Sequence, residues 1–184
     1  MLSKSIDKER IEEYLRKKYD QSFKNVGNGN DSWMSPTKTY LYVDYQGKEF
    51  AVRVSGNRIS DNYGARLFDH TIQADLQKAV PEGCKVFVSS EAEFFDGNKL
   101  FQSCGEYIDN CLILYIKLYA RETADPTLIK ESLTKVIGNV NALVVSYVVS
   151  DEIFDKVDSY TFHLGSVDIK SSESFSINEN KSGS

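Results

Sequence analysis

The chain has few of the residues that build disulfide and cofactor sites, with three cysteines and two histidines among 184 residues. The cysteines are Cys84, Cys104 and Cys111. A set so sparse and odd in number excludes the disulfide framework of a small secreted scaffold, so reduced, buried thiols are expected. One bridge between Cys104 and Cys111 stays open, because it depends on a Cα separation that the sequence does not contain.

Long hydrophobic runs are also missing. The longest apolar run, from Cys111 to Tyr119, is interrupted by Lys117 and is far shorter than the roughly 20 residues that cross a bilayer. A membrane-spanning helix is therefore excluded. The first ten residues contain neither the apolar core nor the cleavage site of a signal peptide. As given, the chain is expected in the cytoplasm, or at the cell surface if a leader has been removed from a longer parent.

What the chain does contain is enough apolar bulk to fold, since 41% of its residues are hydrophobic and 12% are aromatic. We predict one domain over residues 1–170, with possible subunits at 1–80 and 81–170. The remaining residues, 171–184, are rich in Ser, Asn, Lys and Gly and are predicted to be a flexible polar tail.

Charge is unevenly distributed along the chain. Residues 1–60 hold 11 basic and 8 acidic side chains, whereas residues 61–184 hold 11 basic and 19 acidic ones. Because nucleic-acid binding needs a contiguous basic stripe, a nucleic-acid partner is excluded. The dense basic cluster Arg16-Lys17-Lys18 is interpreted as a solvated helix face. The acidic larger part could steer a cationic partner, which makes an inhibitor of a basic toxin one specific hypothesis.

Hydrophobic periodicity divides the first half of the chain into helix, hairpin and helix. The predicted elements are a helix at about 6–19, a strand starting at 23–26, hairpin strands at 37–44 and 49–54, and a helix that follows residue 62 and ends at Pro81. Alternation along the hairpin assigns one face to the core and the other to the outside. The predicted core face is Leu41, Val43, Phe50, Val52 and Val54, and the predicted opposite face is Tyr40, Tyr42 and Arg53.

The second half reads as strand, helix and strand. The predicted elements are a strand at 85–89, a hairpin or turn at 93–101, a strand at 111–121, a helix opened by Asp125-Pro126 and ended by Gly138, a strand at 142–149, a helix at 151–158 and a strand at 160–170. Short loops around the central helix make the two long strands parallel. The predicted fold class is α+β, a mixed sheet with two or three helices packed on it, with an N-terminal helix-hairpin-helix and a C-terminal strand-helix-strand.

Motifs for catalysis and metal binding are missing from the sequence. It has no His-Glu-x-x-His, Cys-x-x-Cys or Gly-x-Ser-x-Gly spacing and no phosphate-binding loop, so neither a metal nor a cofactor is predicted. The acidic group Asp151, Glu152, Asp155 and Asp158 could hold a hard cation, but it has no calcium-loop pattern, and the helix dipole explains Asp151 and Glu152 without an ion. A small hydrolase or thiol enzyme that uses Cys104 and His163 is the alternative hypothesis. Glu106 opposes it, because a neighbouring carboxylate disfavours the thiolate.

The strongest functional signal is tyrosine combined with arginine on strand faces, a combination that is enriched at interaction hot spots. The predicted binding residues are Tyr40, Tyr42 and Arg53, and a second such set is Tyr115, Tyr119 and Arg121. Either set could instead pack beneath a helix or loop. We predict a non-catalytic domain that binds another, unidentified protein, in an oligomeric state that the sequence does not specify.

Three segments together resemble a loose group of uncharacterised small α+β proteins from Gram-positive bacteria, many of them lipid-anchored on the cell surface. The segments are Ile11 to Tyr19 followed by Phe23, Phe50 to Val54, and Ile59 to Tyr63. The group has a "YLxxKYGxxF"-like helix end, then a hairpin, then a "SDNY"-like helix start, and the resemblance covers residues 6–150. Asp20 stands where the group usually has Gly. The resemblance implies the fold but brings no assigned activity and no catalytic residues.

Overall fold

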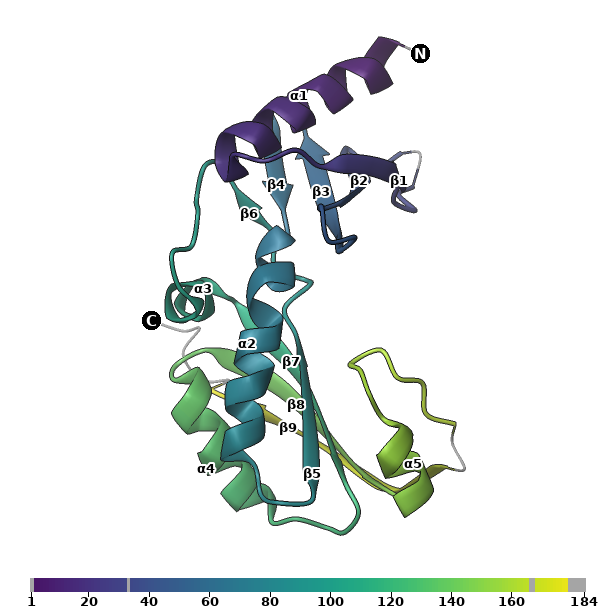
Figure 1. Ribbon diagram of the computed structural model, residues 1–184, viewed down its shortest axis with the longest axis vertical. Coiled ribbons are helices and arrows are strands. Elements are labelled where there is room, and N and C mark those ends of the chain that lie inside the picture. The colour runs from purple at the N-terminus through teal and green to yellow at the C-terminus, as the bar shows by residue number, and fades with distance from the viewer. Residues whose placement is uncertain (1, 33, 166–167, 179–184) are drawn as a thin grey trace. The chain divides into compact units, whose positions relative to one another are not determined.

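The computed structural model describes residues 2–32, 34–165 and 168–178, and within these ranges the fold is α+β with five helices and two sheets (Figure 1). One sheet is antiparallel, with the strand order β1-β2-β3-β4-β6, and the other is mixed, with the order β5-β7-β8-β9. The sequence predicted one mixed sheet, so the second sheet is a correction. In the described ranges no helix is long and apolar enough to cross a membrane.

The chain divides into two compact units, each made of two segments. Unit 1 is Met1–Leu67 with Glu91–Gln102, and unit 2 is Phe68–Ser90 with Ser103–Ser184. These units differ from the suggested subunits 1–80 and 81–170, since residues 68–80 belong to unit 2 and residues 91–102 belong to unit 1. Unit 1 holds 13 basic and 12 acidic side chains, whereas unit 2 holds 9 and 15. The acidic excess therefore belongs to unit 2.

Unit 1 is one long helix on an antiparallel sheet. Its elements are α1 (Leu2–Tyr19), β1 (Lys24–Asn28), β2 (Thr37–Val43), β3 (Glu49–Ser55), β4 (Arg58–Asp61) and β6 (Phe95–Asp96), and α2 (Tyr63–Ala79) begins in it. The hairpin of β2 and β3 confirms the predicted one. Of the two alternatives for 93–101, the structure has the turn, at 97–98, and not the hairpin, because the short strand β6 pairs with β4.

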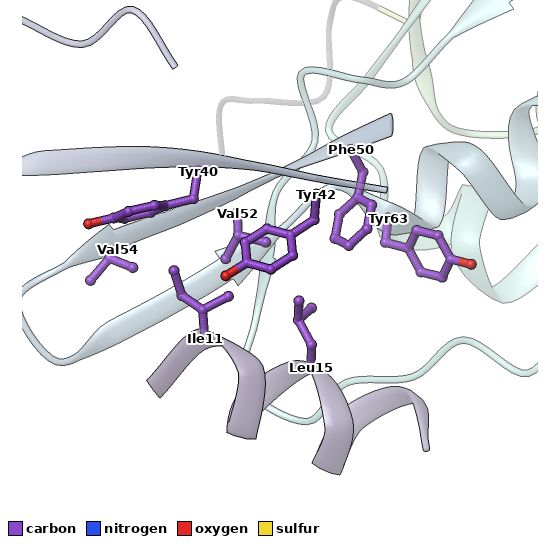
Figure 2. Close-up of a cluster of buried hydrophobic side chains, with 8 residues drawn as sticks. All are labelled: Ile11, Leu15, Tyr40, Tyr42, Phe50, Val52, Val54 and Tyr63. Carbon is purple, nitrogen blue, oxygen red and sulfur yellow. The ribbon is translucent and has the colours of Figure 1, made fainter. Parts of the chain in front are cut away.

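The core of unit 1 lies between α1 and one face of this sheet. Ile11 and Leu15 are one turn apart on α1 and point at the sheet, as Figure 2 shows. They pack on strand residues that are at most 5% exposed, namely Tyr40, Tyr42, Phe50, Val52 and Val54. The spacing of four places both α1 side chains on one face of the helix, which is the reason that this helix covers the sheet.

The register of the hairpin corrects the predicted core face. Val43 pairs with Glu49, so Tyr42 lies opposite Phe50 and Tyr40 lies opposite Val52. The loop therefore has five residues, 44–48, instead of the expected four. Because side chains alternate with a period of two, a one-residue change in register exchanges the two faces of one strand relative to the other. Tyr40 and Tyr42 consequently join the core, and Leu41 shares the outward face with Arg53.

The helix α1 ends just before Asp20, the position where the group of Gram-positive proteins usually has Gly. Asp20 has φ 50°, in the left-handed region, and its N–H donates to the carbonyl of Arg16 at 3.0 Å. This is the position after a helix where glycine is usual, because glycine has no Cβ to clash there. Aspartate tolerates the conformation better than most side chains. Asp20 therefore ends α1 as the usual glycine would.

Unit 2 contains most of α2 and the mixed sheet. Its other elements are β5 (Cys84–Ser89), α3 (Cys104–Asn110), β7 (Ile113–Ala120), α4 (Pro126–Ile137), β8 (Asn141–Val149), α5 (Asp151–Lys156) and β9 (Ile169–Ile177). The predicted parallel pairing of the two long strands is confirmed, with Leu118 of β7 beside Ser146 of β8. The α4 boundaries are also confirmed, since Asp125 caps its first turn and Gly138, at φ 62°, ends it.

The two faces of the mixed sheet carry different cover. In Figure 1, α2 and α4 lie on one side of it and α5 lies on the other. The first side is aliphatic and fully buried, with Leu114, Ile116, Leu118 and Val144 at most 1% exposed. The second side packs Phe87, Tyr119 and Val149 against Phe154 and Val157, in and after α5. This agrees with the need of parallel strands for cover on both faces.

Two predictions for the second half are wrong. The last strand, expected at 160–170, is β9, which runs from Ile169 to Ile177, so most of it lies in the segment 171–184 that was predicted to be a flexible tail. It pairs antiparallel with β8, so hydrogen bonding orders a segment that is poor in apolar residues. Residues 179–184 of that tail lie outside the described residues. The helix α3 was not predicted at all.

Candidate binding site

A polar row crosses the outward face of the antiparallel sheet of unit 1. Thr39 of β2 pairs with Arg53 of β3, which pairs with Ser60 of β4, which pairs with Asp96 of β6. Directly paired residues on neighbouring strands point to the same side of a sheet. The register therefore places a hydroxyl, a guanidinium, a second hydroxyl and a carboxylate side by side.

A second row next to it extends this surface. Thr37 pairs with Ser55, and Ser55 pairs with Arg58. The two rows, together with Asp31 and Phe94, line an open depression of about 490 Å³. We call it the sheet depression: Asp31, Thr37, Thr39, Arg53, Ser55, Arg58, Ser60, Phe94 and Asp96. All nine residues belong to unit 1.

The two arginines of the sheet depression have different surroundings. Arg58 donates to Asp96 Oδ2 from Nε at 3.0 Å and from Nη2, so it is engaged in an exposed ion pair. This hydrogen bond lowers the pKa of Asp96. The exposed Arg53 instead lies over the ring of Phe94, with Cζ 3.7 Å from the ring centroid. Within the described ranges, Arg53 forms no ion pair and no side-chain hydrogen bond.

Asp31 closes one end of the depression. Its carboxylate accepts from the backbone N–H of Thr39 and, at 2.9 Å, from the Thr39 hydroxyl. The Thr39 hydroxyl is thus already engaged. Among the described residues, the hydroxyls of Thr37, Ser55 and Ser60 make no side-chain hydrogen bonds. They remain available to an acceptor in the depression.

The structure separates the three binding residues that the sequence grouped. Tyr40 is 4% exposed and Tyr42 is fully buried, whereas Arg53 is exposed on the opposite face. The Tyr40 hydroxyl donates to Asp7 at 3.0 Å, and the Tyr42 hydroxyl is buried without a partner in the described part of the chain. The face assigned to the two tyrosines was wrong, for the register reason given above. Arg53 alone of the three can be reached by a partner.

A buried ion pair lies on the inner face of the same sheet. Lys18 Nζ is 2.8 Å from Asp61 Oδ2, and both side chains are 1% exposed. The Tyr14 hydroxyl donates to Asp61 at 2.6 Å, and the Tyr19 hydroxyl donates to it at 2.7 Å. The Asp61 carboxylate also accepts from the backbone N–H of Tyr63 at 3.0 Å. The interpretation of Lys18 as part of a solvated face is therefore wrong.

This network joins the C-terminal end of α1 to the residues at the start of α2. Tyr14, Lys18 and Tyr19 come from the helix end, and Asp61 and Tyr63 come from the helix start. Burial and then the charge of Asp61 raise the pKa of the Tyr14 and Tyr19 hydroxyls, so both stay protonated donors. The network is enclosed and its charges are paired. We therefore interpret the network as structural and not as a binding or catalytic site.

The alternative pair, Cys104 and His163, is not joined by a hydrogen bond among the described residues. Cys104 is the first residue of α3, a place that normally favours a thiolate. Burial, followed by the charges of Asp75 and Asp69, nevertheless raises its pKa. His163 is exposed in the segment after α5. The geometry gives no support to a thiol nucleophile. Among the described residues, Cys84, Cys104 and Cys111 form no disulfide, so the bridge between Cys104 and Cys111 that the sequence left open is not present.

A serine in unit 2 has a carboxylate partner but no histidine. The hydroxyl of Ser90, which is fully buried, donates to Asp69 and lies 2.7 Å from the Tyr107 hydroxyl. A serine nucleophile needs a base that takes its proton and access for a substrate. Ser90 is therefore interpreted as a buried structural hydroxyl. No group of three or more His, Cys, Asp or Glu side chains in the described ranges could hold a metal ion.

The second tyrosine and arginine set packs largely beneath α5. Tyr119 is fully buried and stacks on Tyr147, with ring centroids 5.3 Å apart. Arg121 donates to Asp155 at 2.6 Å and lies over the ring of Phe154. Burial of Tyr119 favours packing for this residue, whereas Tyr115 is half-buried and Arg121 is exposed. The three residues therefore do not form one exposed binding surface.

Most of the sheet depression was missed by reasoning from the sequence. Polar and apolar residues alternate in 53–55 and 58–60, which is the period-two signal of an outward strand face, and the hairpin register then adds Thr37 and Thr39 to that face. That signal could have identified Thr37, Thr39, Ser55 and Ser60 once the hairpin register was known. Phe94 carries no local signal, because its segment reaches the sheet only through the tertiary fold.

Comparison with known proteins identifies no relative of the chain: no protein-family model, curated protein or solved structure matches it. The resemblance to the Gram-positive group thus rests on its motifs alone and stays a prediction.

Proposed function

We propose that this protein is a non-catalytic binding domain that captures another protein on the sheet depression of unit 1. The observation that carries this proposal is Arg53, an exposed guanidinium that lies over Phe94 and is not engaged by the described residues. Arginine is one of the residues enriched at hot spots near the centre of protein interfaces, and its planar guanidinium stacks on aromatic faces. The ring covers one side of the guanidinium, so little side-chain entropy is lost on binding.

The surroundings of Arg53 support binding better than chemistry. The depression is open and lies on a rigid sheet, and it contains hydroxyls, two guanidinium groups and two carboxylates. Among the described residues that line it there is no cysteine, histidine or lysine, and its two carboxylates are already bound, Asp96 by Arg58 and Asp31 by Thr39. Such a surface can donate and accept hydrogen bonds with a partner, and it offers a site for specific capture.

Site-specific photo-crosslinking tests the proposal. We would place p-benzoylphenylalanine at Ser55, inside the sheet depression, and at Lys17, exposed on α1, as the matched control. In extracts of the source cells, we expect Ser55 to give one discrete protein adduct that the Lys17 position does not give. Excess unmodified protein should suppress the adduct. Excess Arg53→Glu protein should not, because it has lost the central guanidinium.

Two outcomes would contradict the proposal. One is the absence of any adduct specific to Ser55, and the other is suppression by Arg53→Glu protein as strong as by the unmodified protein. Circular dichroism of the Arg53→Glu variant serves as the folding control. It should match the unmodified protein, because Arg53 is exposed and unpaired.

A further inference from the structure

The charge balance of the sheet depression indicates which chemical group it can hold. Four charged side chains line it: Arg53, Arg58, Asp31 and Asp96. Arg58 is neutralised by Asp96, with Nε 3.0 Å from the carboxylate. Asp31 is bound by the amide and the hydroxyl of Thr39 and keeps its negative charge. One guanidinium, that of Arg53, is therefore left for a ligand.

The groups around Arg53 that can form hydrogen bonds with a ligand are mainly donors. A guanidinium presents parallel N–H groups in a planar fork that matches the two oxygens of a carboxylate. The hydroxyls of Ser55 and Ser60 are not engaged by other side chains in the described residues. Ser60 is the direct cross-strand neighbour of Arg53, and Ser55 is the next outward residue on the same strand. Both can donate to an oxygen that Arg53 binds.

A singly charged group fits this balance better than a doubly charged one. A phosphate would bring nearly two negative charges into a depression that already contains two carboxylates, and Arg53 would offset only one of them. A carboxylate brings one charge, and its planar shape uses both arms of the fork. The aromatic ring of Phe94 beside the guanidinium also offers contact to the methylene groups of an Asp or Glu side chain.

We propose that Arg53, with Ser55 and Ser60, binds the carboxylate of an Asp or Glu side chain in an acidic segment of the partner protein. This inference rests on the proposed function, because it names the group that the sheet depression captures. Unit 1 is nearly neutral, whereas unit 2 carries the acidic excess. An acidic segment therefore meets less repulsion at unit 1 than at unit 2.

Binding of a fluorescein-labelled hexaglutamate peptide, followed by fluorescence anisotropy at low ionic strength, tests the inference. We expect Arg53→Gln to weaken binding about tenfold or more, the size of one lost charge-assisted hydrogen-bond pair. Arg53→Lys should recover only part of this loss, because it keeps the charge but not the fork. The matched control is Arg16→Gln on α1, which removes the same charge outside the depression. It should change the affinity less than about twofold.

Equal losses in Arg53→Gln and Arg16→Gln would overturn the inference, since only the net charge would then matter. Stronger displacement of the peptide by inorganic phosphate than by acetate, at matched ionic strength, would overturn it too.

Adding unlabelled hexaglutamate to the crosslinking experiment separates this inference from the proposed function. Suppression of the Ser55 adduct supports both. A specific adduct that hexaglutamate leaves unchanged keeps the proposed function and overturns the carboxylate inference. Absence of both the adduct and peptide binding overturns both.

Discussion

Unit 1 and unit 2 stabilise their sheets with different kinds of side chain. Beneath the antiparallel sheet, unit 1 buries the charged pair Lys18 and Asp61 together with tyrosine hydroxyls. The face of the unit 2 sheet that α2 and α4 cover is instead aliphatic, with Leu114 and Leu118 fully buried. Hydrogen bonds and ion pairs are directional, whereas apolar packing is not. The difference teaches that the Lys18–Asp61 network of unit 1 depends on particular partners, whereas the aliphatic strand residues of unit 2 depend on volume and periodicity.

The directional network of unit 1 also bears on its candidate site. Tyr14 and Lys18 donate to the Phe95 carbonyl of β6, at 3.3 Å and 3.4 Å, in addition to Asp61 of β4. The outward neighbours of these two strand residues are Asp96 and Ser60, which end the polar row. The inner network thus holds the short strand β6 beside β4. We infer that it fixes the spacing of the groups on the outer face.

The largest expected effect is the loss of one partner of the buried ion pair. Lys18→Met should lower the free energy of unfolding by about 3–5 kcal/mol, because it leaves the Asp61 charge buried and unpaired. Lys17→Met, which breaks an exposed pair with Glu13, should leave it almost unchanged, because solvent screens this pair. Chemical denaturation followed by circular dichroism measures both. Similar values for the two variants would mean that the inner network does not stabilise unit 1.

The tyrosine hydroxyls give a smaller and sharper contrast. Tyr19→Phe removes a 2.7 Å hydrogen bond to the Asp61 carboxylate and should cost about 1.5–3 kcal/mol. Tyr42→Phe in unit 1 and Tyr119→Phe in unit 2 remove buried hydroxyls without partners among the described residues. They should be neutral or stabilising, since no hydrogen bond is lost. The same denaturation measurement compares the three, and a cost for Tyr42→Phe equal to that for Tyr19→Phe would contradict the assignment.

Alkaline pH should destabilise the two units to different extents. Burial raises the pKa of Tyr42 and Tyr63 in unit 1 and of Tyr119 in unit 2 to about 12. The folded state therefore holds protons that the unfolded state releases near pH 10. Stability is complete below pH 10 and is lost toward pH 12, by up to about 1.4 kcal/mol per pH unit for each such tyrosine.

The pKa is also raised for Tyr14, Tyr19 and Tyr40 in unit 1 and for Tyr107 in unit 2, so unit 1 holds more of these groups. We expect unit 1 to lose protection from hydrogen exchange at a lower pH than unit 2. Mass spectrometry of peptides from each unit measures this, after correction for the pH dependence of the exchange chemistry. Simultaneous loss of protection in both units would show that they unfold as one.

The smallest expected effect lies at the end of α1. Asp20→Gly should stabilise unit 1 by about 0.5–1 kcal/mol, because glycine adopts the positive φ of this position without steric cost. Asp20→Ala is the control and should destabilise instead, since alanine has the Cβ but not the polar side chain that tolerates this conformation. Thermal unfolding measures both variants. A lower midpoint for Asp20→Gly than for the unmodified chain would contradict the left-handed assignment.

Local patterns were sufficient where an element has a strong period and clear ends. The helix α4 was predicted because Asp125 and Pro126 start it, Gly138 ends it and its apolar residues recur at helical spacing. The long strands β7 and β8 were predicted by their apolar runs. In contrast, β9 has a polar sequence and exists because β8 offers it an edge to pair with. No sequence pattern within 169–177 indicates that this edge is available for pairing.

In the candidate site, local patterns failed because the predicted turn of the hairpin was wrong by one residue. The alternation of the hairpin was clear, but assigning a face to Tyr42 needed the pairing of Val43 with Glu49. Placing the turn one residue off exchanged the core face of β2 for its outward face. Arg53 was assigned to the outward face correctly, because the alternation of Phe50, Val52 and Val54 on its own strand settles its side. Its ring partner Phe94 was beyond the reach of the sequence.

By itself, the sequence determined the α+β class, the hairpin, the parallel strands around α4 and the position of Arg53 opposite an apolar strand face. These depend on periodicity, capping and turn residues, which act over a few neighbouring positions. Only the tertiary structure decided the two sheets, the register that buries Tyr40 and Tyr42, the pairing of Lys18 with Asp61 and the meeting of Arg53 with Phe94. The hairpin register joins residues as close as Val43 and Glu49, whereas the ion pair joins residues 43 positions apart. All of them depend on how whole strands and helices pair and pack, which no local pattern encodes.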